Sequence, residues 1–308
     1  MNKAFVLGAG LGERLRPLTE QLPKPLVPVY HRPLITYAFD HLRTEAGVGE
    51  FVINTHHLPH CYGEAFPTGV YEGCPVHLRH EPVRLETAGG IANVRDLLDG
   101  SGSFFVYNGD ILTDLPLRPI LEAHEGQGNI ITLALRSQGP AQHIAFDLVR
   151  GLVTDIRNML GTGNQGTHLF TGIYLVSPAF FDWLTPGKKE SVIPIFLNLI
   201  EQGHRVGGVV VDEGRWWDLG SREAYLAAHQ DLRNEPHLPA LDPSAVIDPG
   251  AALTGLNVVG AEAEVAAGAV LEDCILWPGA KVSAGARLRR CIVRANRIAS
   301  GVHDGVDF

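Results

Sequence analysis

GAGLGERLRPLT (residues 8–19) and PKPL (residues 23–26) are the most informative segments of this 308-residue sequence. They follow Lys3–Leu7, a short apolar run that predicts a buried strand. Glycines let backbone N–H groups approach phosphate oxygens closely, and ligands of open α/β sheets bind where strands end. We therefore predict a phosphate-binding loop at a sheet edge, with Arg14 and Lys24 as its cations.

Two common nucleotide-binding patterns do not fit this loop. Its glycines give GxGxG, whereas the dinucleotide fingerprint needs GxGxxG and has a glycine where this chain has Glu13. The Walker pattern GxxxxGK[ST] is also missing, since no GK follows Gly12. A nicotinamide oxidoreductase is therefore disfavoured. A purely structural turn is also disfavoured, because it needs no Arg14, Arg16 or Lys24 beside it.

Strand and helix patterns alternate from this loop onward. The strand-like segments are continuous apolar runs, which are typical of strands buried on both faces. This alternation predicts an α/β fold with a mainly parallel central sheet between layers of helices. The predicted strands are residues 50–54, 104–107 and 129–135, and the predicted helices are residues 33–46, 91–98 and 117–125.

The sequence changes character after residues 234–243, which are rich in proline and polar residues and predict a domain boundary. Beyond this boundary Gly-Ala pairs recur, and a six-residue apolar period is typical of a β-solenoid in which each hexad forms one face of a coil. We expect domains at residues 1–234 and 243–308. Because a short solenoid has open ends to cover, we also expect a homo-oligomer. The apolar residues six apart are Val259, Val265, Leu271 and Trp277.

Composition excludes several classes of protein. The formal net charge of −9 argues against a nucleic-acid partner, because phosphate-backbone binding needs a cationic surface. Cys61, Cys74, Cys274 and Cys291 show no CxxC or metal-ligand spacing, so we expect reduced thiols. No apolar run approaches the roughly 20 residues that span a bilayer, and the first residues do not resemble a signal peptide. We expect a cytoplasmic protein with no membrane partner.

Residues 8–29 resemble the signature GxGxRLxPLTxxxPKPL of sugar-1-phosphate nucleotidylyltransferases. The resemblance covers residues 3–232, and the hexads at 245–293 resemble the left-handed β-helix of hexapeptide repeats appended to several members. It implies a three-layer Rossmann-like domain and an enzyme of nucleotide-sugar biosynthesis, as for cell-envelope polysaccharide. Further matching motifs are NTHHL at 54–58, LETAGGI at 85–91, NGD at 108–110, FTGI at 170–173 and WDLGS at 217–221.

The resemblance implies that the chain converts a nucleoside triphosphate and a sugar 1-phosphate into a nucleotide-sugar and pyrophosphate. It makes Arg14, Lys24 and Asp110 the catalytic residues, and Asp110 and Asp218 the ligands of a Mg²⁺ cofactor. Two carboxylates suit this hard cation, and no general base is needed because the attacking phosphate is already an anion. The implied nucleotide-binding residues are Leu7, Ala9, Gly10, Gly12, Glu13, Arg14, Glu86, Ala88 and Gly89.

The sugar phosphate is assigned less directly. Many relatives carry a Glu-Lys-Pro segment before the FxGI strand, but here that stretch is 153–158 and contains no lysine. Arg157 is the candidate replacement for the lysine. Glu86 either contacts the base or sugar or only caps the following helix. The implied sugar-phosphate-binding residues are Asn54, Gly109, Arg157, Thr171 and Gly172.

The motifs leave the substrates open. The combination of NTHHL, LETAGG, NGDILTD and FTGI is most similar to N-acetylmuramate-1-phosphate uridylyltransferases, which usually lack a solenoid. The solenoid instead resembles that of mannose-1-phosphate guanylyltransferases. Uridylyl transfer is the first expectation, and guanylyl transfer onto mannose or heptose 1-phosphate is the alternative. A non-catalytic nucleotide-sugar-binding subunit is the rival of another class, although such a protein should have lost Arg14, Lys24, Asp110 or Asp218.

Overall fold

The computed structural model describes residues 3–100 and 102–308, which form two compact units. The first, here called the sheet unit, contains residues 1–11, 23–26 and 34–218. The second, here called the solenoid unit, contains residues 12–22, 27–33 and 219–308. The units are spatial groupings, and the domain boundary between residues 234 and 243 stays a prediction.

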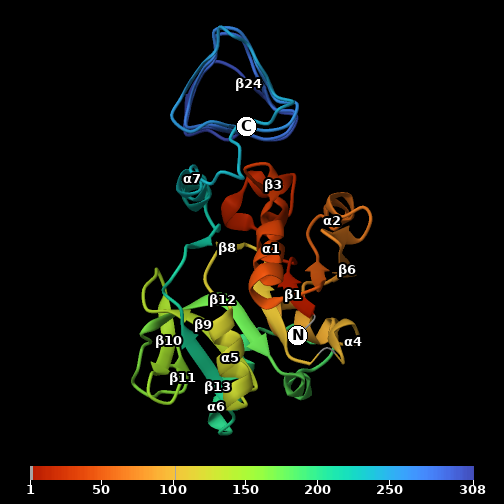
Figure 1. Ribbon diagram of the computed structural model, residues 1–308, viewed down its shortest axis with the longest axis vertical. Coiled ribbons are helices and arrows are strands. Elements are labelled where there is room, and N and C mark those ends of the chain that lie inside the picture. The colour runs from red at the N-terminus through yellow and green to blue at the C-terminus, as the bar shows by residue number, and fades with distance from the viewer. Residues whose placement is uncertain (1–2, 101) are drawn as a thin grey trace. The chain divides into compact units, whose positions relative to one another are not determined.

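The sheet unit is built on one sheet, in which ten described strands follow the order β10-β11-β13-β9-β12-β7-β1-β4-β6-β5 (Figure 1). Strands β7, β1, β4 and β6 pair in parallel, as do β13 and β9. The strands are β1 Lys3–Leu7, β4 Glu50–Thr55, β5 Val70–Tyr71, β6 Cys74–His80, β7 Phe104–Asn108, β9 Ile131–Arg136, β10 Gln142–Asp147, β11 Leu152–Ile156, β12 His168–Val176 and β13 Val206–Val210.

The α/β fold is confirmed, but the prediction of a mainly parallel sheet is correct for only part of it. Strand β12 runs antiparallel to both of its neighbours, β7 and β9. The reason is its connection, because the antiparallel pair β10–β11 precedes β12 where a parallel strand would need a helical crossover. Strand β12 nevertheless reads as a continuous apolar run, because it is central in the sheet and buried.

Helices cover this sheet. Apolar residues of α3, α4 and α6 form one hydrophobic cluster with buried strand residues such as Phe5 and Val52. Helices α1 and α5 contact one another and the strands β1 and β9, respectively, and lie together in front of the sheet in Figure 1. The helices are α1 Leu34–Ala46, α2 His60–Ala65, α3 Glu86–Asn93, α4 Arg95–Leu98, α5 Arg118–Gln127 and α6 Val192–Glu201.

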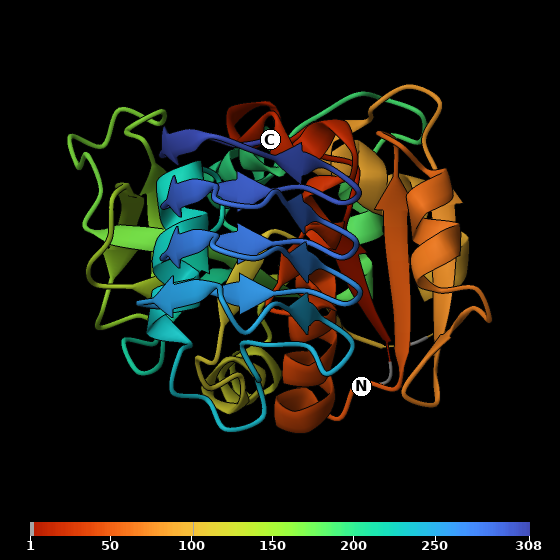
Figure 2. The same cartoon turned by 90° about the horizontal axis from the view of Figure 1, so that it is seen from above.

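The solenoid unit stacks short parallel strands in three sheets, as Figure 2 shows. Val265 and Val282 pair one above the other and point into a buried apolar interior, whereas Glu264 and Lys281 beside them are exposed. The parallel sheets are consistent with the expected β-helix, while its hand and hexapeptide register stay predictions. The strands are β15 Val246–Ile247, β16 Ala252–Thr254, β17 Val258–Val259, β18 Glu264–Val265, β19 Val270–Glu272, β20 Ile275–Leu276, β21 Lys281–Val282, β22 Arg287–Arg289, β23 Ile292–Val293, β24 Ile298–Ala299 and β25 Val302–Asp304.

The solenoid unit also includes segments outside the stack of coils. Helix α7, Arg222–Asp231, and the hairpin of β2, Pro28–Val29, and β3, Arg32–Pro33, belong to it. Trp277 donates from Nε1 to the Tyr225 hydroxyl of α7 at 3.1 Å. Both strand faces in the sheet β17-β20-β23 are therefore buried, since Val258 and Ile292 are fully covered as well as the inward residues.

Candidate active site

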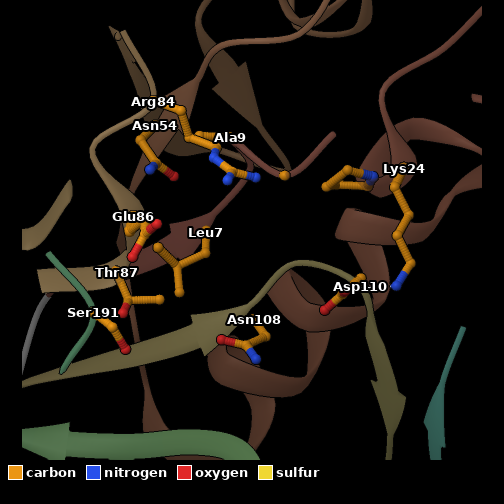
Figure 3. Close-up of a pocket in the computed structure, with 12 residues that line it drawn as sticks. Leu7, Ala9, Lys24, Asn54, Arg84, Glu86, Thr87, Asn108, Asp110 and Ser191 are labelled. Carbon is orange, nitrogen blue, oxygen red and sulfur yellow. Dashed lines mark hydrogen bonds and ion pairs between the residues drawn. The ribbon is translucent and has the colours of Figure 1, made fainter. Parts of the chain in front are cut away.

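A cavity of about 370 Å³ opens at the carboxyl end of β1, where the glycine loop begins (Figure 3). This volume is within the range of small-molecule sites, and the position agrees with the rule for open α/β sheets. A side chain at Gly10 would meet no atom within 4 Å, so this glycine faces open space. The cavity is lined by Leu7, Ala9, Gly10, Lys24, Pro25, Asn54, Arg84, Glu86, Thr87, Asn108, Asp110 and Ser191.

Lys24 joins two aspartates that are far apart in the sequence. Its Nζ lies 2.6 Å from Asp110 Oδ2 and 3.2 Å from Asp218 Oδ1. The cause is an antiparallel ribbon of β8, Ile111–Thr113, and β14, Trp216–Asp218, whose register pairs Asp218 with the residue directly after Asp110. The ribbon therefore brings the two predicted metal ligands together beside Lys24, whereas Arg14, the fourth residue predicted for catalysis or metal binding, is not part of this cluster.

The two aspartates suit a divalent cation. They supply only carboxylate oxygens, the donors that Mg²⁺ prefers, and in the structure one oxygen of each faces the positive charge of the Lys24 ammonium. Lys24 is 6% exposed, whereas the side chains of Asp110 and Asp218 are 33% and 40% exposed and accessible to a ligand. Within the described residues no group of three or more His, Cys, Asp or Glu side chains is placed to hold a metal by itself. A divalent cation bound here would need further oxygen donors besides these two carboxylates.

The first turn of α3, which forms one wall of the cavity, is held by several hydrogen bonds. Glu86, the first residue of α3, has a φ of 61°, a backbone conformation that is strained for a residue with a side chain. The N–H groups of Ala88 and Gly89 donate to the Glu190 carbonyl at 2.9 and 3.2 Å, and Val192 N–H donates to Thr87 Oγ1. Of the predicted residues in this segment, only Glu86 lines the cavity.

The glycine turn is fixed from behind. A side chain at Gly8 would lie 2.6 Å from the Asn54 carbonyl oxygen and 2.8 Å from the Tyr62 hydroxyl, so no larger residue fits. Tyr62 donates to the Gly8 carbonyl at 2.8 Å, and burial raises the pKa of its hydroxyl, which keeps it a donor. The turn therefore presents Ala9 and Gly10 to the cavity in one conformation.

The residues predicted for the sugar phosphate are only partly brought together. Gly109 follows β7 and donates to the Leu7 carbonyl at 3.0 Å. Gly172, with a φ of 83°, packs so closely on Asn108 that a side chain there would lie 2.6 Å from its Nδ2 atom. Thr171 is fully buried and donates to the Ala134 carbonyl. Asn54 is the one residue of these five that lines the cavity, and the other four are not among its lining residues.

Arg157, Gly12, Glu13 and Arg14 are not among the residues that line the cavity. Arg157 is exposed in the turn after β11, with a φ of 57°. Gly12, Glu13 and Arg14 belong to the solenoid unit, in which Gly12 caps a short 3₁₀ helix, Glu13–Leu15. The residues predicted for one nucleotide site are thus divided between the two compact units.

Sequence reasoning missed five cavity residues. Pro25 and Asn108 belong to the PKPL and NGD motifs, so the signal was present. Arg84 and Thr87 flank Glu86, and a cation next to a predicted nucleotide-binding segment was a usable signal. Ser191 had no local signal, because it reaches the cavity through the contacts of Glu190 and Val192 with α3.

Comparison with known proteins identifies the chain. The family model described as nucleotidyl transferase matches residues 3–235. The chain belongs to the nucleotidyl transferase family. It is similar to mannose-1-phosphate guanylyltransferase of Mycobacterium tuberculosis (strain ATCC 25618 / H37Rv), with 30% identity over 93% of this chain and 83% of the relative. It is also similar to N-acetylmuramate alpha-1-phosphate uridylyltransferase of Neisseria meningitidis serogroup B (strain ATCC BAA-335 / MC58), with 34% identity over 71% of this chain and 93% of the relative.

These findings confirm two predictions, membership of the sugar-1-phosphate nucleotidylyltransferase family and enzymatic activity. Mannose-1-phosphate guanylyltransferase 1 of Arabidopsis thaliana is similar too, with 31% identity over 94% of this chain and 81% of the relative. Across the part of the chain that the structure describes, no helix combines the length and apolar character needed to cross a bilayer.

Proposed function

We propose that this enzyme transfers a nucleotidyl group from a nucleoside triphosphate to a sugar 1-phosphate and releases pyrophosphate, with Mg²⁺ as cofactor. The observation that carries the proposal is the convergence of Lys24, Asp110 and Asp218, of which Lys24 and Asp110 line a cavity of ligand size together with Ala9 and Gly10 of the glycine turn. The family match supports the reaction class. Nothing in the proposal requires nucleic acid or a membrane.

The proposed reaction is an in-line displacement at the α-phosphorus. A sugar-phosphate oxygen attacks, the bond from the α-phosphorus to the bridging oxygen breaks, and its electron pair leaves with pyrophosphate. Mg²⁺ on Asp110 and Asp218 would offset the charge of the phosphate oxygens. Lys24 would donate to the phosphoryl oxygens, and we assign Arg14 to the leaving pyrophosphate. Positioning and charge stabilisation would then account for most of the rate.

Two substrate pairs are candidates, each favoured by a specific relative. Uridylyl transfer to an amino sugar, such as N-acetylmuramate 1-phosphate, is the first candidate. It is supported by the LETAGG segment that carries Glu86 and by the 34% identity with the Neisseria relative. Guanylyl transfer to mannose 1-phosphate is the second candidate, supported by relatives whose match extends over 93–94% of the chain and so into the solenoid unit.

The test is a substrate matrix. Pyrophosphate release is measured with Mg²⁺, each of the four common ribonucleoside triphosphates and a panel of sugar 1-phosphates that includes N-acetylmuramate, N-acetylglucosamine, mannose and heptose. We expect kcat/KM for one substrate pair to exceed that for every other pair by at least about 100-fold. The reason is that a site that hydrogen-bonds the base discriminates strongly against bases with other donors and acceptors. Absence of turnover with every pair would contradict the proposal and favour the non-catalytic subunit.

A further inference from the structure

A buried carboxylate lies behind the cavity and has no place in the proposed chemistry. Glu81 directly follows β6 and is completely shielded from solvent. Its Oε1 accepts from Asn54 Nδ2 at 2.8 Å, and its Oε2 accepts from Leu85 N–H at 2.9 Å. No ion pair to Glu81 occurs among residues 3–100 and 102–308. Burying an acid without a cationic partner lowers the stability of the folded protein. The hydrogen bonds that Glu81 accepts there therefore call for an explanation.

Asn54 extends this contact to the glycine turn. Its Oδ1 accepts from Gly8 N–H at 2.8 Å, so both ends of the Asn54 amide are engaged. The result is a relay of three hydrogen bonds that runs from Gly8 through Asn54 and Glu81 to Leu85. Gly8 begins the turn that presents Ala9 and Gly10, and Leu85 lies between two cavity residues.

The relay fills its space completely. Asn54 is 1% exposed, and Glu81 has no exposed surface. A side chain on Gly90 of α3 would lie 3.0 Å from Asn54 Nδ2 and 3.1 Å from Glu81 Oε1. Because the interior is close-packed, the two chain segments can approach or separate only if this relay breaks.

We propose that Asn54 and Glu81 are positioning residues that fix the distance between the two walls of the nucleotide pocket. One wall is the turn at residues 8–10, and the other is the segment at residues 84–87. The inference rests on the proposed function, because it assumes that a triphosphate binds between these walls. It assigns Asn54 a supporting role in the nucleotide site in addition to the predicted contact with the sugar phosphate.

The hydrogen-bond pattern permits a charge-conserving exchange as a test. In Glu81→Gln alone, the new amide N–H group faces either Asn54 Nδ2 or Leu85 N–H, both of which are donors, so one hydrogen bond is lost. In Asn54→Asp alone, two carboxylates face each other and repel. In the double variant the introduced aspartate accepts from Gly8 N–H and from the introduced glutamine, whose oxygen accepts from Leu85 N–H. All three hydrogen bonds return with donor and acceptor reversed at the central one.

The single variants should raise KM for the triphosphate about tenfold, which corresponds to roughly 1.4 kcal/mol, and should change KM for the sugar 1-phosphate much less. The double variant should recover the parental KM to within about threefold. Glu122→Gln, an exposed carboxylate on α5, serves as the matched control and should behave as the parent. Thermal unfolding is followed in parallel for every variant.

Gly90→Ala supplies an independent test if a single variant does not fold, because it displaces the relay without removing any of its groups. It should also raise KM for the triphosphate selectively. A folded double variant with a KM no better than the worse single variant would overturn the inference, as would parental KM values in Glu81→Gln and Gly90→Ala. Failure of the parent itself to turn over any substrate pair would instead reject the proposed function.

Discussion

Asp110 is the residue whose replacement separates chemistry from folding most cleanly. It directly precedes β8, is partly exposed and has Lys24 as its cationic partner. Asp110→Asn keeps the shape of the side chain but removes its charge, so kcat should fall by about 10³-fold or more. The melting temperature should change little, because the side chain is accessible to solvent.

Asp114→Asn is the matched control for this prediction. Asp114 lies in the same segment and is 51% exposed, but it binds Arg215 and does not line the cavity. Its replacement should leave kcat within about twofold of the parent. A near-normal rate for Asp110→Asn at saturating Mg²⁺ would reject the metal role of Asp110.

Arg84 carries a prediction of its own at this scale. Its guanidinium lines the cavity, and in the described chain it has no hydrogen-bond or ion-pair partner. Arg84 therefore offers the nucleotide a second cation, besides the Lys24 that the proposed mechanism assigns to the phosphoryl oxygens. Arg84→Ala should raise KM for the triphosphate about tenfold, measured by steady-state kinetics. Arg95 is a half-exposed arginine on α4, and Arg95→Ala should leave KM for the triphosphate unchanged.

At the scale of elements, one buried carboxylate organises the turn after β11. Asp155 accepts hydrogen bonds from Ile156 N–H at 2.7 Å, Leu160 N–H at 3.1 Å, and the N–H and hydroxyl of Thr162. Burial raises the pKa of Asp155, but these donors outweigh it and hold the pKa below its usual value. Asp155→Asn should therefore lower the free energy of unfolding by about 2–4 kcal/mol at pH 7.

The depressed pKa also fixes the pH dependence of this effect. A carboxylate with a lowered folded pKa contributes stability above its unfolded pKa, which is lost as the pH falls through the folded pKa. The deficit of Asp155→Asn should thus be full at pH 7 and shrink below about pH 4. Urea unfolding at both pH values measures it. Asp147, the half-buried last residue of β10, accepts from only two N–H groups, so Asp147→Asn should show a smaller deficit. An equal loss for Asp155→Asn at both pH values would contradict the electrostatic explanation.

At the scale of the whole molecule, the solenoid unit contains part of the predicted nucleotide loop. Arg294 of the last coils, 7% exposed, donates to the Pro17 carbonyl at 2.8 Å, to Glu20 at 3.0 Å and to the Phe308 carbonyl at 2.7 Å. Thr19 in the same segment donates to the Gly12 carbonyl at 2.9 Å. The solenoid therefore holds the segment that carries Arg14.

Arg294→Met should slow turnover by about 10-fold or more, because it releases a segment assigned to the leaving pyrophosphate. Arg289→Met is the control within the solenoid, since Arg289 forms an exposed ion pair with Asp304 on the outer surface. Such exposed pairs contribute little, and this variant should keep parental kinetics. Equal turnover rates for the two variants would show that the Arg294 contacts do not contribute to catalysis.

The fold was predictable where the signal is local. The apolar run of β1 followed by glycines predicted the strand and its turn, and small residues with a short apolar period predicted the parallel stack. The antiparallel course of β12 was not predictable, because a strand buried on both faces has the same composition in either direction. Strand direction depends on connections to distant segments.

The candidate site shows the same division. Lys24 and Asp110 stand in recognisable motifs, but their approach to Asp218 depends on the register of β8 and β14, which no local pattern encodes. The resemblance to a family provided that pairing. Ser191 was missed because only backbone contacts of its neighbours bring it to the cavity.

The placement of Lys24 between two aspartates has a practical consequence. In many small metalloproteins the ligands repel one another when the ion is withdrawn, and the fold is lost with it. Here an internal ammonium compensates the two negative charges. We therefore expect EDTA to abolish pyrophosphate release without lowering the melting temperature, and added magnesium to restore full activity at once. The protein should therefore remain folded, although inactive, during purification and storage in chelator.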